Sequence, residues 1–163
     1  LFLKHIRNRD LWLNELPGGD KVTAWIQSNP LTLESMQDMD EIMSSLGGIE
    51  LALQAGIHIL RYRAQLVEIM VKSFCIADIG GFQVPVVNAS CLASEVTNRL
   101  CQDWPQYPFA ASYVDDAKKA IRLWRLTSIG EFDVSEIAKL YGGGGHRNAA
   151  GFHQMLSIED VKQ

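Results

Sequence analysis

The alternation of apolar and polar residues predicts one long helix near the middle of the chain. Over Ile49–Phe74, apolar residues recur at intervals of four and three, an average period of 3.5 residues. A second apolar stripe runs along the same segment, which predicts a helix that packs on two sides. At 1.5 Å per residue the helix would be roughly 39 Å long. The first stripe consists of Leu53, Ile57, Leu60, Ala64, Val67, Val71 and Phe74.

Three shorter helices are predicted before the long one. Asp20 and Thr32 stand where a side-chain oxygen caps a helix N-terminus, and glycine or proline breaks separate the helical stretches. The chain up to about residue 72 is therefore expected to be helical. The three predicted helices are Leu1–Arg9, Asp20–Ser28 and Thr32–Ser45.

After the long helix, the pattern changes to short runs that are partly β-branched. Gly80-Gly81 separates two such runs and predicts a hairpin. Asp133, with Glu136 three residues later, has the spacing of a capping box and predicts a short helix. The expected fold class is α/β, with an N-terminal helical connector followed by a compact domain that has a mixed sheet of about five strands and flanking helices. The predicted strands are Phe74–Ile79, Phe82–Asn88, Phe109–Val114, Ala120–Thr127 and Gly151–Met155, with a further helix at Cys91–Cys101.

The composition is that of an ordinary globular protein. Of 163 residues, 47% are apolar and 21% charged, and the formal net charge is −4. No overall field attracts nucleic acid, so any phosphate binding must come from a local patch. The three cysteines are odd in number and lack CxxC spacing, which favours buried thiols in a reducing cytoplasm. No apolar run approaches the roughly 20 residues that span a bilayer, and no signal peptide opens the chain, so no membrane partner is expected.

The most informative segment is the glycine run Gly142, Gly143, Gly144 and Gly145, followed by His146 and Arg147. Glycine loses more backbone entropy on folding than any other residue, so four in succession need a reason. One reason is an anion nest, in which main-chain N–H groups point at a phosphate. His146 and Arg147 stand beside this nest and can donate to phosphate oxygens. A flexible glycine turn with a chance histidine is the alternative, and glycine content alone leaves both open.

The stretch GGGGHRNAAGF at 142–152 closely resembles the signature of the substrate-binding domain that follows the catalytic domain in DHH-family phosphoesterases. Phe132–Lys139, Val86–Ala89 and the helix with Ser94, Glu95 and Asn98 fit the same family. Arg9–Trp12, followed by Leu16-Pro17, resembles the end of the catalytic lobe in the oligoribonuclease-like or cyclic-nucleotide-phosphodiesterase-like branch. On this resemblance, 1–48 is a helical remnant of the catalytic lobe, 49–74 is the connecting helix, and 75–163 is the DHH-associated substrate-binding domain.

The resemblance implies a metal-dependent enzyme. Family members hydrolyse phosphodiesters or phosphoanhydrides with two divalent metals, usually Mn²⁺, which are held mainly by an N-terminal lobe. The Asp-His-His triplet that names the family is missing from this sequence. We therefore expect the metal lobe to be mostly absent from this chain, no cofactor to bind tightly to this segment alone, and the segment by itself to be inactive. The implied partners are a short oligonucleotide or small phosphorylated substrate and the N-terminal DHH lobe of the same protein.

The resemblance also implies roles for single residues. It makes the glycine run, His146 and Arg147 the phosphate-binding group, with His146 as the catalytic residue facing the metals across an interdomain cleft. The family tends to carry an arginine at the position of Thr127, and Arg125 lies two residues earlier on the same face of the strand. Arg125 is therefore a candidate phosphate ligand in its place, although a different mode of substrate binding stays open.

Two further assignments remain open at the level of sequence. Asp10 corresponds by position to a late metal ligand of the catalytic lobe, and a helix-end or salt-bridging carboxylate beside Arg9 is the alternative. Lys118, Lys119 and Arg122 would join Arg125 in a small basic patch, for which solvated surface charge is the alternative.

The predicted function is the substrate-binding portion of a metal-dependent phosphohydrolase that cleaves phosphodiester or phosphoanhydride bonds of short oligonucleotides or small nucleotides. An exopolyphosphatase-like hydrolase is one alternative. An RNA-binding module like the C-terminal domain of alanyl-tRNA synthetases is another, although the net negative charge argues against it. A structural fragment that dimerises through the 3.5-residue stripe is a third, so a homodimer stays open. Trp104, in a proline-bounded loop, is the candidate platform for base stacking.

Overall fold

The structure is a computed structural model, and it describes residues 2–10 and 15–156. The chain divides into two compact units, Leu1–Gln65 and Leu66–Gln163, and the boundary falls inside the long helix α4 (Gly48–Val71). Within the described ranges, no single helix has both the length and the apolar character to cross a membrane; α3 and α4 meet these criteria only as a pair bent by 114°.

The first unit is helical, as predicted. It contains α1 (Phe2–Asp10), α2 (Gly19–Gln27), α3 (Leu33–Ser44) and the first part of α4. Thr32 caps α3 by accepting a hydrogen bond from the Ser35 amide at 3.2 Å, as its position predicts. The cap predicted at Asp20 is wrong, because α2 begins one residue earlier with Gly18 as its N-cap. The core of this unit consists of Phe2, Val22, Trp25, Ile26, Met39, Met43 and Ala52.

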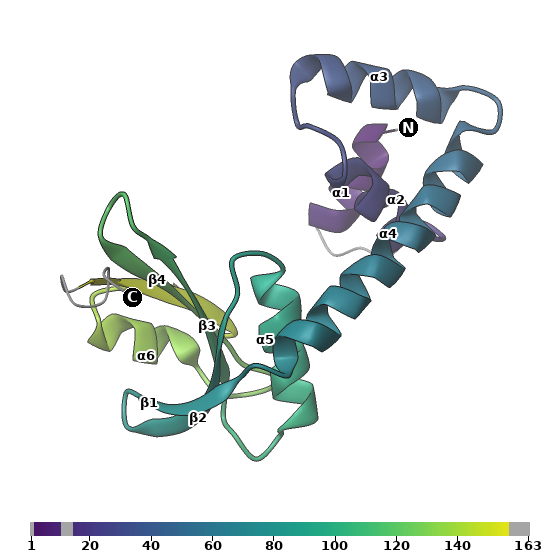
Figure 1. The fold of residues 1–163 in the computed structure, drawn as a ribbon. Coiled ribbons are helices and arrows are strands. Elements are labelled where there is room, and N and C mark those ends of the chain that lie inside the picture. Colours follow the sequence, from purple (N-terminus) through teal and green to yellow (C-terminus); the bar gives the residue numbers. More distant parts are fainter. Residues whose placement is uncertain (1, 11–14, 157–163) are drawn as a thin grey trace. The chain divides into compact units, whose positions relative to one another are not determined.

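The second unit is a sheet with helices on both faces (Figure 1). The strand order is β1-β2-β3-β4-β6-β5, and β2 and β3 are the parallel pair in an otherwise antiparallel ladder. The fold-class prediction is confirmed, except that the sheet has six strands within the part of the chain that the structure describes. The elements are β1 (Cys75–Ile79), β2 (Phe82–Asn88), α5 (Ala93–Asp103), β3 (Ala110–Asp116), β4 (Ile121–Thr127), α6 (Val134–Leu140), β5 (Gly144–His146) and β6 (Ala149–Met155).

The strand that the sequence does not predict is β5, inside the glycine run. Glycine is depleted in strands because it has no side chain to pack and loses backbone entropy, so the run gives no strand signal. Its pairing with β6 nevertheless forms over Gly144 to His146. The glycine-histidine segment is therefore part of the sheet edge.

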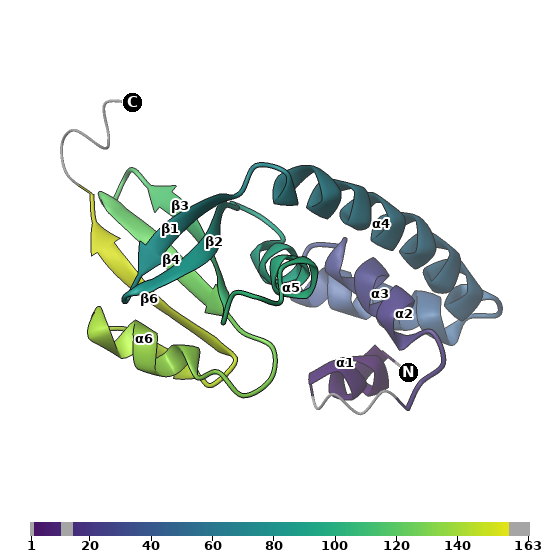
Figure 2. The same cartoon turned by 90° about the horizontal axis from the view of Figure 1, so that it is seen from below.

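Each face of the sheet carries its own core, and α6 and α5 cover opposite faces in both views (Figures 1 and 2). On the α6 face, Val84, Phe109 and Leu126 are almost completely buried. On the α5 face, Val87, Val96 and Leu100 are buried together with the end of α4. Fully burying side chains of this size contributes about 1.5–3 kcal/mol each.

Asp133 caps the start of α6 as predicted, whereas the carboxylate of Glu136, the second member of the predicted capping box, binds Lys139. The Asp133 carboxylate accepts hydrogen bonds from the Ser135 amide at 2.9 Å and the Ser135 hydroxyl at 2.6 Å. These bonds lower the pKa of Asp133, the Ser135 hydroxyl contributing most. Glu136 forms an ion pair with Lys139 at 2.6 Å. The cap fixes where the loop before α6 ends, and that loop braces the glycine-histidine segment.

Candidate functional site

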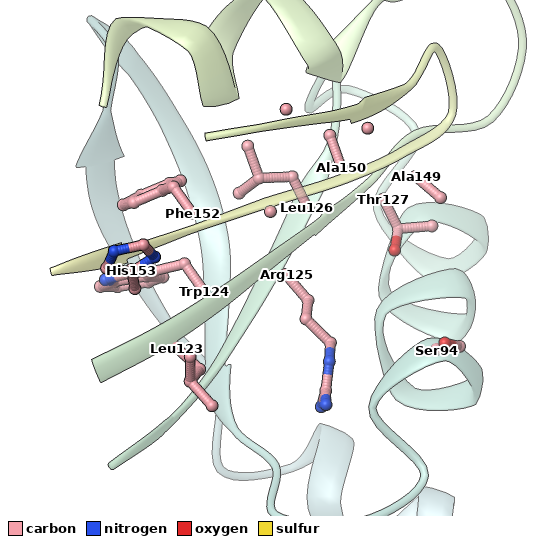
Figure 3. A pocket seen from close by; sticks show the side chains of 13 residues that line it. Ser94, Leu123, Trp124, Arg125, Leu126, Thr127, Ala149, Ala150, Phe152 and His153 are labelled. Atoms are coloured by element: carbon pink, nitrogen blue, oxygen red, sulfur yellow. The ribbon is translucent and has the colours of Figure 1, made fainter. Parts of the chain in front are cut away.

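A pocket of about 510 Å³ opens on the α5 face of the second unit (Figure 3). Its walls come from β4, β5, β6 and the first turn of α5, which contributes Ser94. Arg125 extends from β4 on the same side as Thr127, whereas Leu126 points to the opposite side (Figure 3). This alternation is the ordinary period of two along a strand.

The strand register arranges the predicted residues in two parallel rows. Arg125 pairs with Gly151, which pairs with Gly144 in β5. Thr127 pairs with Ala149, which pairs with His146. Side chains of directly paired residues lie on the same face of a sheet, so His146 lies on the face of Thr127. Arg125 is two residues from Thr127 on the same strand and therefore shares this face, which is the face of the pocket. His146 is exposed to solvent in the neighbouring row.

Arg125 differs from the other arginines of the second unit. Arg99 pairs with Glu68 and Asp103, Arg122 with Asp115, and Arg147 with Glu131. Arg125 is exposed, and among the described residues it has no hydrogen bond or ion pair with the protein. Its guanidinium is therefore available to an anionic ligand in the pocket.

Arg122 and Lys119, predicted to join Arg125 in a basic patch, have acidic partners elsewhere. Arg122 lies over the ring of Tyr113, 4.2 Å from its centroid, and binds the Asp115 carboxylate with two hydrogen bonds. It stands three residues before Arg125 and so faces the other side of the sheet. Lys119 pairs with Asp116 at 3.5 Å. The positive charge at the pocket therefore rests on Arg125 and not on a cluster.

The first two glycines of the run terminate α6. The Gly142 amide donates to the Lys139 carbonyl at 3.0 Å, and the Gly143 amide to the Ala138 carbonyl at 2.9 Å. This is the Schellman pattern, and Gly142 has the positive φ of 75° that the motif requires. A Cβ on Gly143 would lie 2.2 Å from the Gly151 carbonyl oxygen. The anion nest predicted for the whole run is thus wrong for Gly142 and Gly143, because their amides are used by the helix end.

The last two glycines line the pocket. A Cβ on Gly144 would meet nothing within 4 Å, so the space beside it is open. A Cβ on Gly145 would lie 2.5 Å from the Ala150 Cα, and its φ is 149°. Gly145 therefore allows β5 to approach β6 closely. Gly144 and Gly145 pair with β6 in strand β5, and the anion nest predicted at these two residues stays a prediction.

The turn after His146 is held by the loop that precedes α6. The Arg147 guanidinium donates to the Glu131 carbonyl at 2.6 and 3.0 Å and to the Glu131 carboxylate at 2.7 Å. The Asn148 amide donates to the Ser128 hydroxyl at 3.0 Å and the Gly130 carbonyl at 2.9 Å. Arg147, predicted as a phosphate ligand, is positioned as a brace for the turn. Such bracing holds His146 in place before a ligand binds.

Thr127 anchors the floor of the pocket to α5. Its hydroxyl lies 2.7 Å from that of Thr97, and its carbonyl accepts from the Cys101 thiol at 3.2 Å. Burial raises the pKa of Cys101 to about 11. Cys75 and Cys91 are exposed, so the prediction of buried thiols is wrong for these two residues.

Sequence reasoning missed part of the pocket wall. Ser94 and His153 line it, whereas the sequence marked Ser94 as a family feature alone. Alternation along β6 places His153 on the face of Gly151, but only the register shows that this face adjoins Arg125. Trp104, the predicted base platform, is partly buried and packs against Phe74, with ring centroids 4.5 Å apart, beside the core of the α5 face.

The described residues do not fit a metal by themselves. Within 2–7 and 15–156, no three His, Cys, Asp or Glu side chains are grouped to hold an ion. Asp10 ends α1, but its side chain lies outside the described residues, so its predicted role as a metal ligand stays a prediction. His5 is buried, and burial lowers its pKa.

Two curated relatives cover the chain in part. It is 33% identical over 95 residues to oligoribonuclease NrnB of Bacillus subtilis, a match that covers 58% of this chain and 21% of that protein. The chain is similar to the DHH-associated part of a DHH-family phosphoesterase. The resemblance to this family that the glycine-histidine signature indicated is thereby confirmed. The chain is also 26% identical over 155 residues to an uncharacterized protein of Acanthamoeba polyphaga mimivirus, covering 92% of this chain and 36% of that one.

The other comparisons add less. No family model matches the sequence. The fold is similar to a pGpG-specific phosphodiesterase, PggH, of Vibrio cholerae at 15% identity, with a TM-score of 0.46 over 76% of this chain and 41% of that one. It is also similar to an exopolyphosphatase-related protein of Bacteroides fragilis at 17% identity, with a TM-score of 0.45 over 71% and 39%. At such scores these likenesses carry no argument. The chain spans about a fifth to a third of the length of its curated relatives.

Proposed function

We propose that this chain is the substrate-binding portion of a DHH-family phosphohydrolase that cleaves phosphodiester bonds of short oligonucleotides. The observation that carries the proposal is the pocket on the α5 face, where Arg125, which has no hydrogen bond or ion pair among the described residues, shares a row with the side-chain-free wall of Gly144 and Gly145. The similarity to an oligoribonuclease supports the choice of oligonucleotide.

In this proposal the residues of the pocket bind and orient the substrate. The wall at Gly144 and Gly145 has no side chains, so a phosphate can approach the main chain closely. His146 projects on the same face and donates to a phosphate oxygen. Arg125 supplies a charge-assisted hydrogen bond, which is roughly twice as strong as a neutral one. Ser94 adds a hydroxyl from α5.

The chemistry of hydrolysis belongs to the rest of the proposed enzyme. Two Mn²⁺ ions, held mainly by an N-terminal DHH lobe of the same protein, would supply the nucleophile and stabilise charge at the reacting phosphate. We expect the 163 residues alone to bind short nucleotides weakly and not to hydrolyse them. The cytoplasm is the proposed location.

The test is hydrolysis of the dinucleotide pApA with Mn²⁺ by the full-length protein. We expect His146→Ala to lower kcat/KM by about 10²-fold or more, in the range found for loss of one positioned hydrogen-bond donor to a reacting group. His58→Ala is the matched control, because His58 is an exposed histidine of α4 in the other unit. Unchanged turnover in His146→Ala would contradict the role of His146. Tight, salt-sensitive binding of structured RNA by the full-length protein, without hydrolysis, would favour the RNA-binding alternative.

A further inference from the structure

Two walls of the pocket stand on strands that are not neighbours. Arg125 is on β4, Gly144 is on β5, and β6 runs between them. Neighbouring strands are about 4.8 Å apart, so the Arg125 strand and the Gly144 strand are about 10 Å apart. Arg125 also extends away from the sheet and not along it toward β6 (Figure 3).

The floor between the walls carries small side chains without charge. Gly151 lies in the row of Arg125, and Ala149 in the next row. Among the described residues that line the pocket, Arg125 has the one permanently positive side chain. The pocket therefore offers one cationic position, then an uncharged floor, then the main-chain wall of Gly144 and Gly145.

The size of the pocket exceeds what a single phosphate needs. Its volume of about 510 Å³ lies in the range of pockets that hold whole small-molecule ligands, about 300–1,000 Å³. A phosphate seated against Gly144 and Gly145 would leave Arg125 facing the unfilled remainder. Arg125 makes no hydrogen bond or ion pair with the described protein that would give it a structural task instead.

From this arrangement we infer that Arg125 binds a second phosphate, one nucleotide away from the phosphate at the Gly144–Gly145 wall. The inference rests on the proposed function and narrows its substrate class. In an oligonucleotide a sugar separates successive phosphates, which suits two anion positions with an uncharged floor between them. In inorganic polyphosphate successive phosphates share one oxygen, so a bound chain would place uncompensated charge over Gly151 and Ala149. The pocket therefore selects a short oligonucleotide with a terminal phosphate over polyphosphate.

Calorimetric titration of the 163-residue chain with three probes tests this inference. The probes are pApA, which has two phosphates, ApA, which has one, and inorganic tripolyphosphate. We expect pApA to bind about tenfold more tightly than ApA, the effect of one hydrogen-bonded charge pair. Tripolyphosphate should bind more weakly than pApA. In Arg125→Gln the preference for pApA should disappear while the affinity for ApA stays the same, and Arg125→Lys should keep part of the preference.

Arg122→Gln is the matched control, because Arg122 pairs with Asp115 on the opposite face of the sheet. It should keep the full preference for pApA. If Arg125→Gln binds pApA and ApA in the wild-type ratio, or if the wild-type chain binds tripolyphosphate as tightly as pApA, the second-phosphate role is wrong while the proposed function stands. If neither dinucleotide binds the wild-type chain, both the inference and the proposed function are overturned.

Discussion

The hydroxyl groups of Thr97 and Thr127 lie 2.7 Å apart and join α5 to the strand that carries Arg125. Thr97 is almost completely buried, and its hydroxyl also lies 2.9 Å from the Ala93 carbonyl oxygen. The position at which the family tends to carry an arginine is here committed to a contact within the protein. Arg125, two residues earlier, lines the pocket instead.

Thr127→Val should therefore destabilise the second unit without abolishing ligand binding. The substitution removes one partly buried hydrogen bond, which contributes about 0.5–1.5 kcal/mol. Urea unfolding of the variant measures the loss, and Thr127→Ser, which keeps the hydroxyl, is the control. Equal stability of Thr127→Val and the wild-type chain would show that the contact does not stabilise the fold.

Alanine at two adjacent glycines should give opposite phenotypes. Gly143→Ala places a Cβ 2.2 Å from the Gly151 carbonyl oxygen, and overpacking of this kind costs about 1–3 kcal/mol. Gly144→Ala meets no atom within 4 Å, so its stability should stay within about 0.5 kcal/mol of wild type. Because Gly144 lines the pocket, its variant should bind pApA more weakly. Thermal unfolding and calorimetry separate the two effects, and a destabilised Gly144→Ala with normal affinity would contradict this division of tasks.

The salt dependence of binding should distinguish Arg125 from Arg147. Each phosphate contact to single-stranded nucleic acid contributes about −0.7 to the slope of log K against log salt concentration. Arg125→Gln should lose about one such contact. Arg147→Gln should weaken binding with the slope unchanged, because the guanidinium of Arg147 holds Glu131 and not the ligand. A slope reduced as much by Arg147→Gln would restore Arg147 as the direct phosphate ligand that the sequence predicts.

The first unit should lose stability in mild acid through His5. His5 is buried, its Nδ1 has no hydrogen-bond partner among the described residues, and burial lowers its pKa. In mild acid His5 is therefore protonated more readily in the unfolded chain than in the folded unit. The free energy of unfolding decreases as the pH drops below the pKa of histidine in the unfolded chain, about 6.5. Hydrogen exchange of the α1–α3 amides against pH measures this loss. His5→Phe should flatten the dependence, and an unchanged pH profile would show that His5 is not its source.

Local signals in the sequence predicted much of the fold. Thr32 and Asp133 cap their helices as expected because a cap depends on a few neighbouring residues. The 3.5-residue stripe predicted the long helix, observed at Gly48–Val71. β5 was missed, because its glycines give no strand signal and its pairing with β6 compensates for their weak propensity.

The site depended on information that the sequence does not carry. Alternation placed Arg125 and Thr127 on one face, but the partner strand and its register decide that Gly151 and Gly144 complete that row. Ser94 reaches the pocket from helix α5, about thirty residues before Arg125 in the sequence. The glycine run looked like one nest, and its division between a helix end and a pocket wall became visible only through the hydrogen bonds of Gly142 and Gly143.

Backbone amide shifts of the 163-residue chain, followed by NMR during titration with pApA, test whether the glycine-histidine segment and Arg125 bind the ligand together. We expect saturable shifts at Gly144, Gly145 and His146, accompanied by the side-chain Nε–H of Arg125, with smaller changes at Gly142 and Gly143. An unshifted Gly144–His146 segment at ligand saturation, or shifts confined to residues 1–65, would contradict this expectation.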